Sequence, residues 1–396
     1  MQRMSPVSVP TVTLAAKQTH RCLIGHPWIF RSELNGLEGL DTALEVRLED
    51  HRKRFIGRGF YSQKSQIAIR LASRRDEPLD EAFLRRRIAT AIASRPAKPA
   101  RRLVSSEADL LPGLIVDQYA DCLVVQTTTA GMDQRQDTCV AILNDLLHPS
   151  QIIERNDLAV RDLEGLAQRV GVLRGSPDTT CTVRIGKLDT SLDLLDPHKT
   201  GTYLDQQQAH EDFGRWIKPG DRILDICCHL GGFALHGLLA GAREAVAVDQ
   251  SAASIAGCMA AAMKAGVASQ LTAVCADAFT WLKEADERRE EFDVVVLDPP
   301  SFTRNRAGVT DALRGYHDLH LRGLRRLRPG GRLLTFSCSH HISRDDFLGN
   351  VVAAAADAKR TLRLDAVLGA SPDHPVLPAV PETEYLKGFV LTVLDS

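Results

Sequence analysis

The 396-residue sequence lacks the features that mark membrane-spanning, exported and metal-binding proteins. No stretch of apolar residues approaches the roughly 18 that a transmembrane helix needs. The first thirty residues contain no basic segment followed by an apolar one, as a secretory signal peptide would. None of the nine cysteines is in C-x-x-C spacing, and the only close pair, Cys227-Cys228, is adjacent in sequence. We therefore expect a cytoplasmic protein with no membrane span, no disulfide framework and no metal site.

What the chain does contain is typical of a soluble globular enzyme. Apolar residues make up 44% and charged residues 25% of the sequence, which is enough to build a core and to solvate a surface. A single hydrophobic core rarely grows to this chain length, so we expect two or three domains. The sequence has neither internal repeats nor low-complexity tracts.

The net charge of −1 conceals an uneven distribution. Residues 1–102 contain 20 lysines and arginines against 10 acidic residues, whereas residues 103–396 contain 29 against 40. A basic first third favours a local anionic partner such as nucleic acid. The alternative interpretation is ordinary solvated surface charge.

Residues 7–75 have the pattern of a small β-rich module. Short runs of β-branched and apolar residues are separated by glycine, asparagine, aspartate and charged turns; these runs are Val7–Leu14, Ala43–Leu48, Phe55–Tyr61 and Ile67–Leu71. The third run is surrounded by basic residues, which are the candidates for contacts with an anionic partner: Arg52, Lys53, Arg54, Arg58 and Lys64.

A middle α+β region follows a boundary at residues 74–80. Apolar residues with helical spacing predict a helix over Glu81–Ser94. Further apolar runs and helical segments then occur at Leu114–Asp117, Leu123–Thr127, Thr138–Leu147, Gln151–Arg155 and Thr182–Ile185.

From about residue 191 the pattern changes to strands alternating with helices. We expect strands at Arg222–Cys227, Glu244–Val248, Leu271–Cys275, Asp293–Leu297, Arg332–Ser337 and Gly388–Val393. We expect helices between them at Gly232–Ala240, Ala252–Ala265, Thr280–Arg288 and Tyr316–Leu327. Short apolar strands joined by helices predict a parallel sheet that is covered on both faces.

Three successive strands of this sheet end in residues suited to a nucleoside. The first ends at Asp225 and is followed by Gly231-Gly232 at a helix start, although the pattern is not G-x-G-x-x-G. The second ends at Asp249, where a carboxylate suits ribose hydroxyls, and the third is followed by Asp277, which could face an adenine amino group. Individually these are also typical of tight turns and helix N-caps. Together they predict a nucleoside crevice.

The fourth and fifth strands end in groups suited to chemistry on a planar base. Asp298-Pro299-Pro300 forms a stiff turn because proline fixes φ, and Phe302 could stack on the base. Cys338 closes the fifth strand, so its thiol would lie at the ligand side of the sheet. The alternatives are a strand-terminating Pro-Pro and an inert buried cysteine. His340 and His341 would lower the pKa of the thiol if they were near, but exposed loop histidines are the simpler interpretation.

These motifs, in this order, resemble class I S-adenosylmethionine-dependent methyltransferases. More narrowly, the chain resembles the bacterial ribosomal RNA large subunit methyltransferase I family, which makes 5-methylcytosine in 23S rRNA. The resemblance covers essentially the whole chain and rests on the segments Gly25–Phe30, Ser106–Asp109, Leu111–Asp117, His198–Gln206, Asp298–Phe302, Thr335–Ser339 and Tyr385–Phe389. The chain departs from the family in two places. The loop Cys227–Leu230 stands where relatives usually carry an aromatic residue followed by Ser, Tyr and Thr. Ser301 stands where lysine is common. Both leave room for altered cofactor affinity or a different target nucleotide.

The resemblance implies an α/β fold of three domains. These are a small β-barrel PUA-like RNA-binding domain (1–75), an α+β middle domain (76–190) and a Rossmann-like methyltransferase domain with a mostly parallel seven-stranded sheet (191–396). It implies S-adenosyl-L-methionine as cofactor. The partner would be 23S rRNA or a large-subunit assembly intermediate, and a homodimer is an assembly that the resemblance allows.

The resemblance also implies a set of site residues. The cofactor-binding residues would be Lys199, Thr200, Gly201, Tyr203, Asp225, Gly231, Gly232, Asp249, Gln250, Asp277, Ala278 and Asp298. The RNA-binding residues would be Pro299, Pro300, Phe302, Arg52, Lys53, Arg54 and Arg58. Cys338 and Asp298 would be catalytic: the thiolate adds to carbon 6 of cytosine, and the carboxylate hydrogen-bonds N3 and the exocyclic amine.

Three other functions remain open at this point. A guanine-N methyltransferase would use Asp298-Pro299-Pro300 without a covalent step. A non-catalytic RNA-binding protein would not need Asp249, Asp277, Asp298 and Cys338 to be intact. A small-molecule methyltransferase explains neither the basic first third nor Cys338.

Overall fold

The computed structural model describes residues 9–16, 20–195, 201–303 and 305–394, which fall into two compact units. The first unit comprises residues 1–183, 191–204 and 372–383, and the second comprises residues 184–190, 205–371 and 384–396. The predicted division into three domains stays a prediction. In the part of the chain that is described, none of the helices combines the length and apolar content that a membrane crossing needs.

The first unit begins with a six-stranded sheet in the order β2-β6-β5-β4-β1-β3. Its strands are β1 (Thr11–Leu14), β2 (Trp28–Phe30), β3 (Leu34–Asn35), β4 (Glu45–Glu49), β5 (Phe55–Tyr61) and β6 (Ile67–Ser73). Val12, Val46, Leu48 and Ile69 are fully buried between these strands, because alternate residues of each strand point to one face. The prediction of a small β-rich module is confirmed; the expected first run includes Val7 and Ser8, which lie outside the described residues.

The same unit contains a five-stranded sheet in the order β11-β10-β9-β8-β7, of which only β9 and β10 pair in parallel. The elements are α1 (Glu81–Ala93), β7 (Ala100–Ser105), β8 (Leu114–Tyr119), β9 (Cys122–Thr127), α2 (Ala130–Asp133), α3 (Gln136–Leu147), β10 (Gln151–Asn156), α4 (Val160–Glu164) and β11 (Arg169–Arg174). Asp80 begins α1, and its carboxylate accepts a hydrogen bond from the backbone N–H of Phe83 at 3.0 Å. Apolar residues of α1 and α3 pack on β8 and β9 in one core.

The two sheets of the first unit share that core. Phe60 of β5 belongs to it, and a Cβ atom on Gly131 of α2 would lie only 2.3 Å from the Cβ of Phe60, so that only glycine fits. The indole N–H of Trp28 donates to Glu107 at 2.9 Å, and Arg70 donates to the buried Glu164 at 2.6 Å. These contacts give Trp28, in the segment Gly25–Phe30, a structural role.

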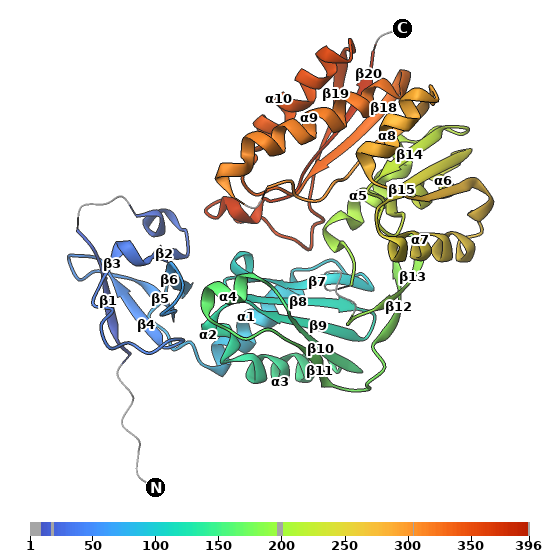
Figure 1. Ribbon diagram of the computed structural model, residues 1–396. Helices are drawn as coiled ribbons and strands as arrows, with labels where there is room; N and C mark the ends of the chain where they lie inside the picture. The colour runs from blue at the N-terminus through green and yellow to red at the C-terminus, as the bar shows by residue number, and fades with distance from the viewer. Residues whose placement is uncertain (1–8, 17–19, 196–200, 304, 395–396) are drawn as a thin grey trace. The chain divides into compact units, whose positions relative to one another are not determined.

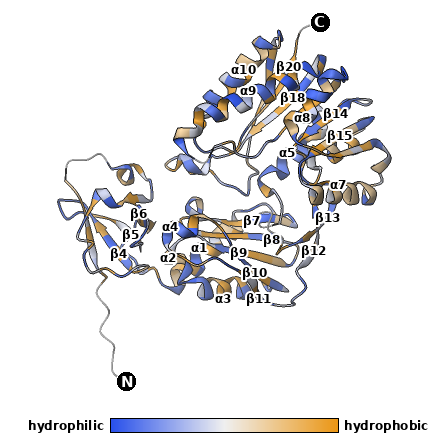
Figure 2. Cartoon of the chain, viewed as in Figure 1, coloured by the Kyte–Doolittle hydropathy of each residue, from blue (hydrophilic) through white to orange (hydrophobic). Residues whose placement is uncertain are grey.

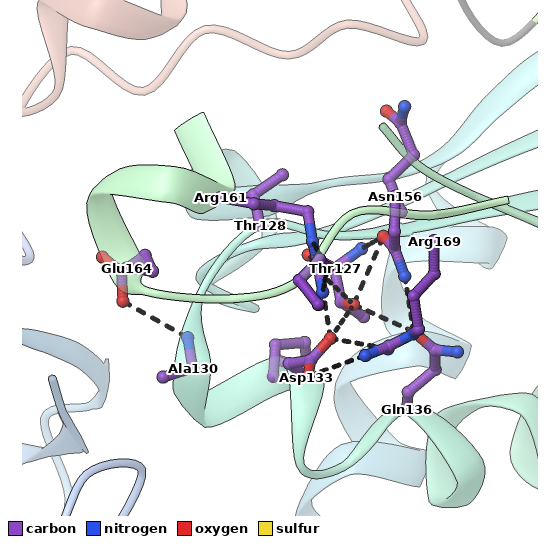
Figure 3. A network of polar contacts seen from close by, with 12 residues as sticks. Thr127, Thr128, Ala130, Asp133, Gln136, Asn156, Arg161, Glu164 and Arg169 are labelled. Carbon is purple, nitrogen blue, oxygen red and sulfur yellow. Dashed lines mark hydrogen bonds and ion pairs between the residues drawn. The ribbon is translucent and has the colours of Figure 1, made fainter. Parts of the chain in front are cut away.

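A buried polar network lies where β9 and β10 end (Figure 3). The guanidinium of Arg161, which is fully buried, donates to the backbone carbonyl of Thr127 and to Asp133 Oδ1 at 2.9 Å. Arg169 donates to the same carboxylate oxygen at 2.8 Å. The backbone N–H of Thr127 donates to Asn156 Oδ1 at 2.7 Å. Every charge in this group therefore has an opposite charge or a hydrogen-bond partner, as burial requires.

One segment of the first unit is remote from the rest of that unit in sequence. Residues 372–383 separate two strands of the second unit, yet their contacts are with the first unit. Glu382 accepts a hydrogen bond from Arg21 at 2.9 Å and lies 3.1 Å from His26 Nε2, and Asp373 accepts from the backbone N–H of Arg102 at 2.8 Å. The strands β12 (Thr180–Ile185) and β13 (Leu188–Asp193) form a separate two-stranded sheet.

The second unit is built on a seven-stranded sheet in the order β16-β15-β14-β17-β18-β20-β19. Its strands are β14 (Arg222–Ile226), β15 (Glu244–Asp249), β16 (Leu271–Cys275), β17 (Phe292–Leu297), β18 (Leu327–Ser337), β19 (Leu362–Gly369) and β20 (Lys387–Val393). Strands β14 to β18 pair in parallel, and β20 is antiparallel to both of its neighbours. The predicted mostly parallel seven-stranded sheet is confirmed.

Helices cover both faces of this sheet (Figure 1). On one face α5 (Gln207–Asp212), α6 (Gly232–Leu239) and α7 (Ala252–Lys264) pack against alternate strand residues such as Val296 and Phe336. On the other face α8 (Ala278–Glu287), α9 (Val309–Arg325) and α10 (Arg344–Asp357) pack against the intervening residues such as Leu297 and Leu333. The strands are correspondingly hydrophobic, whereas the helices carry residues of mixed hydropathy (Figure 2).

Several elements differ from the sequence-based expectation. The strands β7, β11, β13 and β19 and the helix α10 were not expected, and α9 begins at Val309 rather than Tyr316. Both β11 and β19 form sheet edges and have few buried residues, so the apolar pattern that identifies a strand is weak in them. Helix α9 begins in a polar turn in which only Ala312 is buried before Tyr316.

Replacing Asp133 with asparagine is expected to destabilise the first unit by about 3 kcal/mol, because the buried Arg161 guanidinium loses its counter-charge. The pKa of Asp133 points the same way: burial would raise it, but hydrogen bonds from Arg169 and Arg161 outweigh burial and lower it. Urea unfolding followed by circular dichroism measures the effect. Asp137→Asn, at an exposed position of α3, is the matched control and should change stability little. Equal unfolding curves for the two variants would contradict the structural role of the network.

Candidate active site at the carboxyl edge of the seven-stranded sheet

The strand order has a topological switch point beside the carboxyl end of β14. This strand pairs in parallel with β15 on one side and β17 on the other. The helix that follows β14, α6, packs on one face, whereas the helix that follows β17, α9, packs on the opposite face. Loops that leave a sheet in opposite directions open a crevice between them, and ligands of open α/β sheets bind there.

The loop after β14 adopts an unusual backbone conformation. Cys227, His229 and Gly231 have φ angles of 62°, 49° and 77°, in the left-handed region. A Cβ atom on Gly231 would lie 2.3 Å from the sulfur of Cys258, so no larger residue fits this position. The backbone N–H of His229 donates to Asp249 Oδ2 at 2.9 Å, which ties the loop to the end of β15.

Asp225, at the end of β14, is fully buried and holds the start of α6. Its Oδ2 accepts a hydrogen bond from the backbone N–H of Ala234 at 3.0 Å. Its Oδ1 is buried and has no hydrogen-bond partner among the described residues. Burial, with smaller contributions from the charges of Asp298 and Asp249, raises the pKa of Asp225 to about 8. A buried carboxyl oxygen without a partner is a ready acceptor for a donor or cation from a ligand.

Asp249 and Asp277 follow the next two strands along this edge. Asp249 Oδ1 accepts from the backbone N–H of Ser251 at 2.9 Å, in addition to the bond from the loop. Asp277 is exposed and begins α8, where its Oδ1 accepts from the backbone N–H of Thr280 at 2.9 Å. The helix-capping interpretation of Asp277 therefore holds, and it does not exclude a ligand role for the second oxygen. The expected cofactor residues Gln250 and Ala278 adjoin these two acids in sequence.

Asp298, after β17, is held by a residue that sequence reasoning did not select. The side chain of Gln206, only 2% exposed, donates from Nε2 to Asp298 Oδ2 at 2.9 Å. The oxygen of the same amide, Oε1, is buried without a hydrogen-bond partner among the described residues. Its neighbour Asp205 accepts from the hydroxyl of Tyr385 at 2.7 Å. Gln206 lies in the segment His198–Gln206 that carries the family resemblance, which was the available signal.

Cys338 and Asp298 belong to the same face of the sheet. Leu297 of β17 pairs with Thr335 of β18, and both side chains point toward α9. Because side chains alternate between the two faces along a strand, the next residue after each, Asp298 and Phe336, points toward α5 and α6. Cys338 follows Phe336 by two residues and contacts the core on that same face. The residue is only partly buried.

The turn that carries Cys338 is joined to the Pro-Pro turn. The hydroxyls of Ser301 and Ser339 lie 2.9 Å apart, and the Ser339 hydroxyl lies 3.3 Å from that of Tyr316. Burial raises the pKa of Tyr316 to about 12, so its phenol stays neutral. His340 and His341 are both exposed, which agrees with the simpler interpretation of loop histidines.

The ring of Phe302 lies near two other aromatic rings of the protein. Its centroid is 4.6 Å from that of Tyr316 and 6.3 Å from that of Phe279, and the residue remains partly exposed. Pro299 is buried and Pro300 is exposed. The stacking of Phe302 on a substrate base stays a prediction.

Four predicted cofactor residues do not join this set. Lys199 and Thr200 lie outside the described residues. Gly201 and Tyr203 belong to the first unit, where a Cβ atom on Gly201 would lie 3.0 Å from the ring of Tyr119. Their cofactor role therefore stays a prediction.

The predicted RNA-binding arginines and lysine lie in or beside β5 of the first unit. Arg52 and Lys53 are exposed in the turn between β4 and β5, and Arg54 donates to Asp50 at 2.6 Å. Arg58 differs from them, because its guanidinium forms ion pairs with Glu45 at 2.7 Å and Asp76 at 2.6 Å and is only 16% exposed. Arg58 therefore has a structural role within this sheet.

Within the described residues no cluster of three or more histidine, cysteine, aspartate or glutamate side chains could hold a metal ion. The acids at the sheet edge are spread over separate strand ends, where each accepts hydrogen bonds from backbone or amide groups.

The strand order with an antiparallel β20, and the acids at successive carboxyl ends, define a class I methyltransferase domain. Residues 12–74 match a family described as PUA-like domain, and residues 208–321 match one described as Conserved hypothetical protein 95. The structure is similar to that of SMU.776 solved with SAH (TM-score 0.84, 19% identity, 97% of this chain and 100% of that chain). It is also similar to a structure from Streptococcus mutans that is described as a SAM-dependent methyltransferase (TM-score 0.82, 18% identity, 97% of this chain and 100% of that chain). At these identities the likeness concerns the fold.

Curated relatives match the sequence over nearly its whole length. Ribosomal RNA large subunit methyltransferase I of Tolumonas auensis is 37% identical over 97% of this chain and 99% of its own. The protein of that name from Photobacterium profundum is 36% identical over 93% of this chain and 95% of its own length. The one from Klebsiella pneumoniae is 33% identical over 97% of this chain and 98% of its own length. The chain belongs to the ribosomal RNA large subunit methyltransferase I family.

The buried carboxyl of Asp225 predicts a pH-dependent stability. An ordinary aspartate has a pKa near 4, so between about pH 4 and 8 the folded chain binds one proton more than the unfolded chain at this site. The free energy of unfolding therefore falls as pH rises through this window, by up to about 1.4 kcal/mol per pH unit. Asp225→Asn removes this dependence, so the variant should gain stability relative to the wild type between pH 5 and 8.

Urea unfolding at pH 5, 6, 7 and 8 measures the difference between the two proteins. Asp311→Asn, whose side chain is 80% exposed, is the matched control and should follow the wild type at every pH. A constant difference between Asp225→Asn and the wild type over this range would show that Asp225 is already ionised at pH 5.

Proposed function

We propose that this protein is an S-adenosylmethionine-dependent methyltransferase that methylates carbon 5 of a cytosine in 23S rRNA through a covalent adduct on Cys338. The observation that carries the proposal is the placement of Cys338 and Asp298 on one face of the sheet at its carboxyl edge. A nucleophilic sulfur and a carboxylate facing one crevice are the two groups that this chemistry needs.

The residues of the crevice fit S-adenosyl-L-methionine. The buried oxygens of Asp225 and Gln206 that lack partners are suited to its cationic and hydrogen-bond-donating amino-acid part. Asp249 is placed for the ribose hydroxyls and Asp277 for the adenine amino group, as their order along the edge suggests. Gly231 and Gly232 bring the backbone close to the nucleoside at the start of α6. When bound, this cofactor supplies a methyl group on a sulfonium, which is electrophilic.

In the proposed reaction the Cys338 thiolate donates an electron pair to carbon 6 of the cytosine, and a C–S bond forms. The electrons of the C5=C6 double bond shift so that carbon 5 becomes nucleophilic; it would bond the methyl group as the bond from that methyl to the sulfonium sulfur breaks, which leaves a neutral thioether as the departing product. A base then removes the proton from carbon 5, the double bond re-forms and the C–S bond breaks, which releases Cys338. Asp298, oriented by Gln206, accepts a hydrogen bond from the exocyclic amine and, in its protonated form, donates one to N3, which stabilises the negative charge that develops on the ring.

The target base must be unpaired or flipped out to reach the crevice. Residues 1–75 would bind the RNA backbone with exposed basic residues such as Arg52 and Lys53, residues 76–190 would support them, and residues 191–396 would carry out the methylation. Backbone contacts position an RNA without reading its sequence, so the choice of base belongs to the crevice. A ribosomal substrate would place the enzyme in the cytoplasm.

Cys338→Ala is expected to reduce methylation of undermodified 23S rRNA by several orders of magnitude, since carbon 5 is a poor nucleophile without the adduct. Transfer of labelled methyl groups measures the rate, and mass spectrometry maps the modified atom. Cys275→Ala, at an exposed cysteine at the end of β16, is the matched control and should stay active. Full activity of Cys338→Ala would refute the covalent route, and a methylguanine product would identify a guanine-N methyltransferase instead.

Replacing both Arg52 and Lys53 with alanine should weaken RNA binding about tenfold and lower the slope of log Kd against log salt by about 2, because two phosphate contacts are lost. Fluorescence anisotropy with a labelled 23S rRNA fragment at several KCl concentrations measures both quantities. The double variant Arg215→Ala, Lys218→Ala removes the same charge from the second unit and should leave the slope unchanged. An unchanged slope in the Arg52, Lys53 variant would exclude this turn from the RNA interface.

A further inference from the structure

A short 3-10 helix between β1 and β2 presents two large apolar side chains to solvent. This helix, η1 (Arg21–Ile24), buries Cys22 in the core of the six-stranded sheet and leaves an apolar pair, Leu23 and Ile24, 57% and 76% exposed. In the part of the chain that the structure describes, no other large apolar residue is as exposed as Ile24. Adjacent apolar side chains held out on a turn are typical of an interaction surface.

The backbone of η1 is held in place on both sides. Before it, the buried His20 Nδ1 lies 2.9 Å from Glu33 Oε1. After it, Gly25 has a φ angle of 105°, in the left-handed region, and Nε2 of the buried His26 lies 3.1 Å from Glu382 Oε2. The turn therefore presents the apolar pair outward in a fixed conformation, and the entropy cost of ordering it on a partner is small.

Strand pairing brings basic residues to the same end of this sheet. The parallel pairing of β1 with β4 places the turn between β4 and β5 at the end where the chain leaves β1. The antiparallel pairing of β5 with β6 sets Ser73, the last residue of β6, opposite Arg58, so the chain leaves β6 at this end as well. The two connections carry four exposed basic side chains: Arg52, Lys53, Arg74 and Arg75. The guanidinium of Arg74 donates to the backbone carbonyl of His26 at 3.1 Å, directly after η1.

The charges at this end of the sheet indicate a polyanionic partner. Among the described residues these four basic side chains form no ion pair, whereas Arg21 within η1 pairs with Glu382 at 2.9 Å. Unpaired surface cations attract a phosphate backbone. Apolar side chains do not bind phosphate, but they pack on the faces of nucleotide bases, which are accessible where RNA is unpaired. Basic residues around an apolar pair therefore fit single-stranded RNA.

We propose that Leu23 and Ile24 form an RNA-contact surface on which an unpaired base of the substrate packs, while Arg52, Lys53, Arg74 and Arg75 bind neighbouring phosphates. The proposal rests on the proposed function, because it takes the rRNA substrate as the partner. It adds a contact that distinguishes unpaired from paired RNA, which phosphate contacts alone do not supply.

The test is the binding of two RNAs to the full chain, measured by fluorescence anisotropy at several KCl concentrations. One RNA is a labelled, uridine-rich single strand of about 12 nucleotides, and the other is the fully paired duplex of that strand. The variant Leu23→Ser, Ile24→Ser removes the apolar pair. The matched control Val160→Ser, Leu163→Ser removes two side chains of α4 in the same unit, which are 41% and 68% exposed.

The variant Leu23→Ser, Ile24→Ser should bind the single strand about tenfold more weakly, and the duplex by less than about twofold, because one base contact is lost. The slope of log Kd against log salt should stay that of the wild type, since no phosphate contact is removed. Ile24→Phe should bind the single strand at least as tightly as the wild type, because an aromatic ring stacks on a base. The control should bind both RNAs like the wild type. In methylation of 23S rRNA, KM should rise while kcat changes little.

Unchanged binding of the single strand by Leu23→Ser, Ile24→Ser would overturn the proposal, and an equal loss for the single strand and the duplex would overturn the contact with an unpaired base. Circular dichroism shows whether the variants fold; if the double variant does not, Ile24→Ser alone decides by the same comparison. Binding does not depend on turnover. An active Cys338→Ala enzyme would therefore refute the proposed function, whereas an unchanged Kd would refute only this surface.

Discussion

The parallel pairing of β14 with β15 and β17 is the constraint on which the rest of the second unit depends. It brings the carboxyl ends of the strands to one edge, so that Asp225, Asp249 and Asp298 gather there although they are far apart in sequence. It also sends α6 and α9 to opposite faces and thereby opens the crevice. A shift of one residue in the β17–β18 register would turn Cys338 toward the opposite face, because strand side chains alternate. The chemistry is therefore determined by strand pairing before any ligand binds.

Sequence reasoning identified the elements whose residues are buried on a regular pattern. Strands β14 to β18 contain short apolar runs with an acid or a cysteine at or just after their carboxyl ends, so both the strands and these residues could be predicted. The edge strand β19 and the strand β11 escaped notice because their residues are largely exposed, and a half-exposed strand resembles a loop in sequence. A register cannot be read from one strand alone, so the placement of Cys338 and Asp298 on one face was a hypothesis until the pairing was known.

The residues that orient the site were harder to predict than the acids and the thiol. Gln206 acts through a contact that joins segments 92 residues apart in the sequence, and its side chain has no distinctive spacing. A glutamine within a polar segment is usually on the surface, and only burial shows that this one is not. The same limit applies to Arg58, whose basic character suggested RNA contact and whose ion pairs with Glu45 and Asp76 show a structural role.

The crevice reconciles two opposite electrostatic requirements. A sulfonium cofactor favours a concentration of acids, and burial together with the charges of neighbouring carboxylates accordingly raises the pKa of Asp225. A cysteine nucleophile needs the reverse, because a thiolate is disfavoured by the same carboxylates. The amide of Gln206 holds Asp298 on the same face without adding a charge, so the acids that suit the sulfonium and the thiol that must ionise share one edge of the sheet.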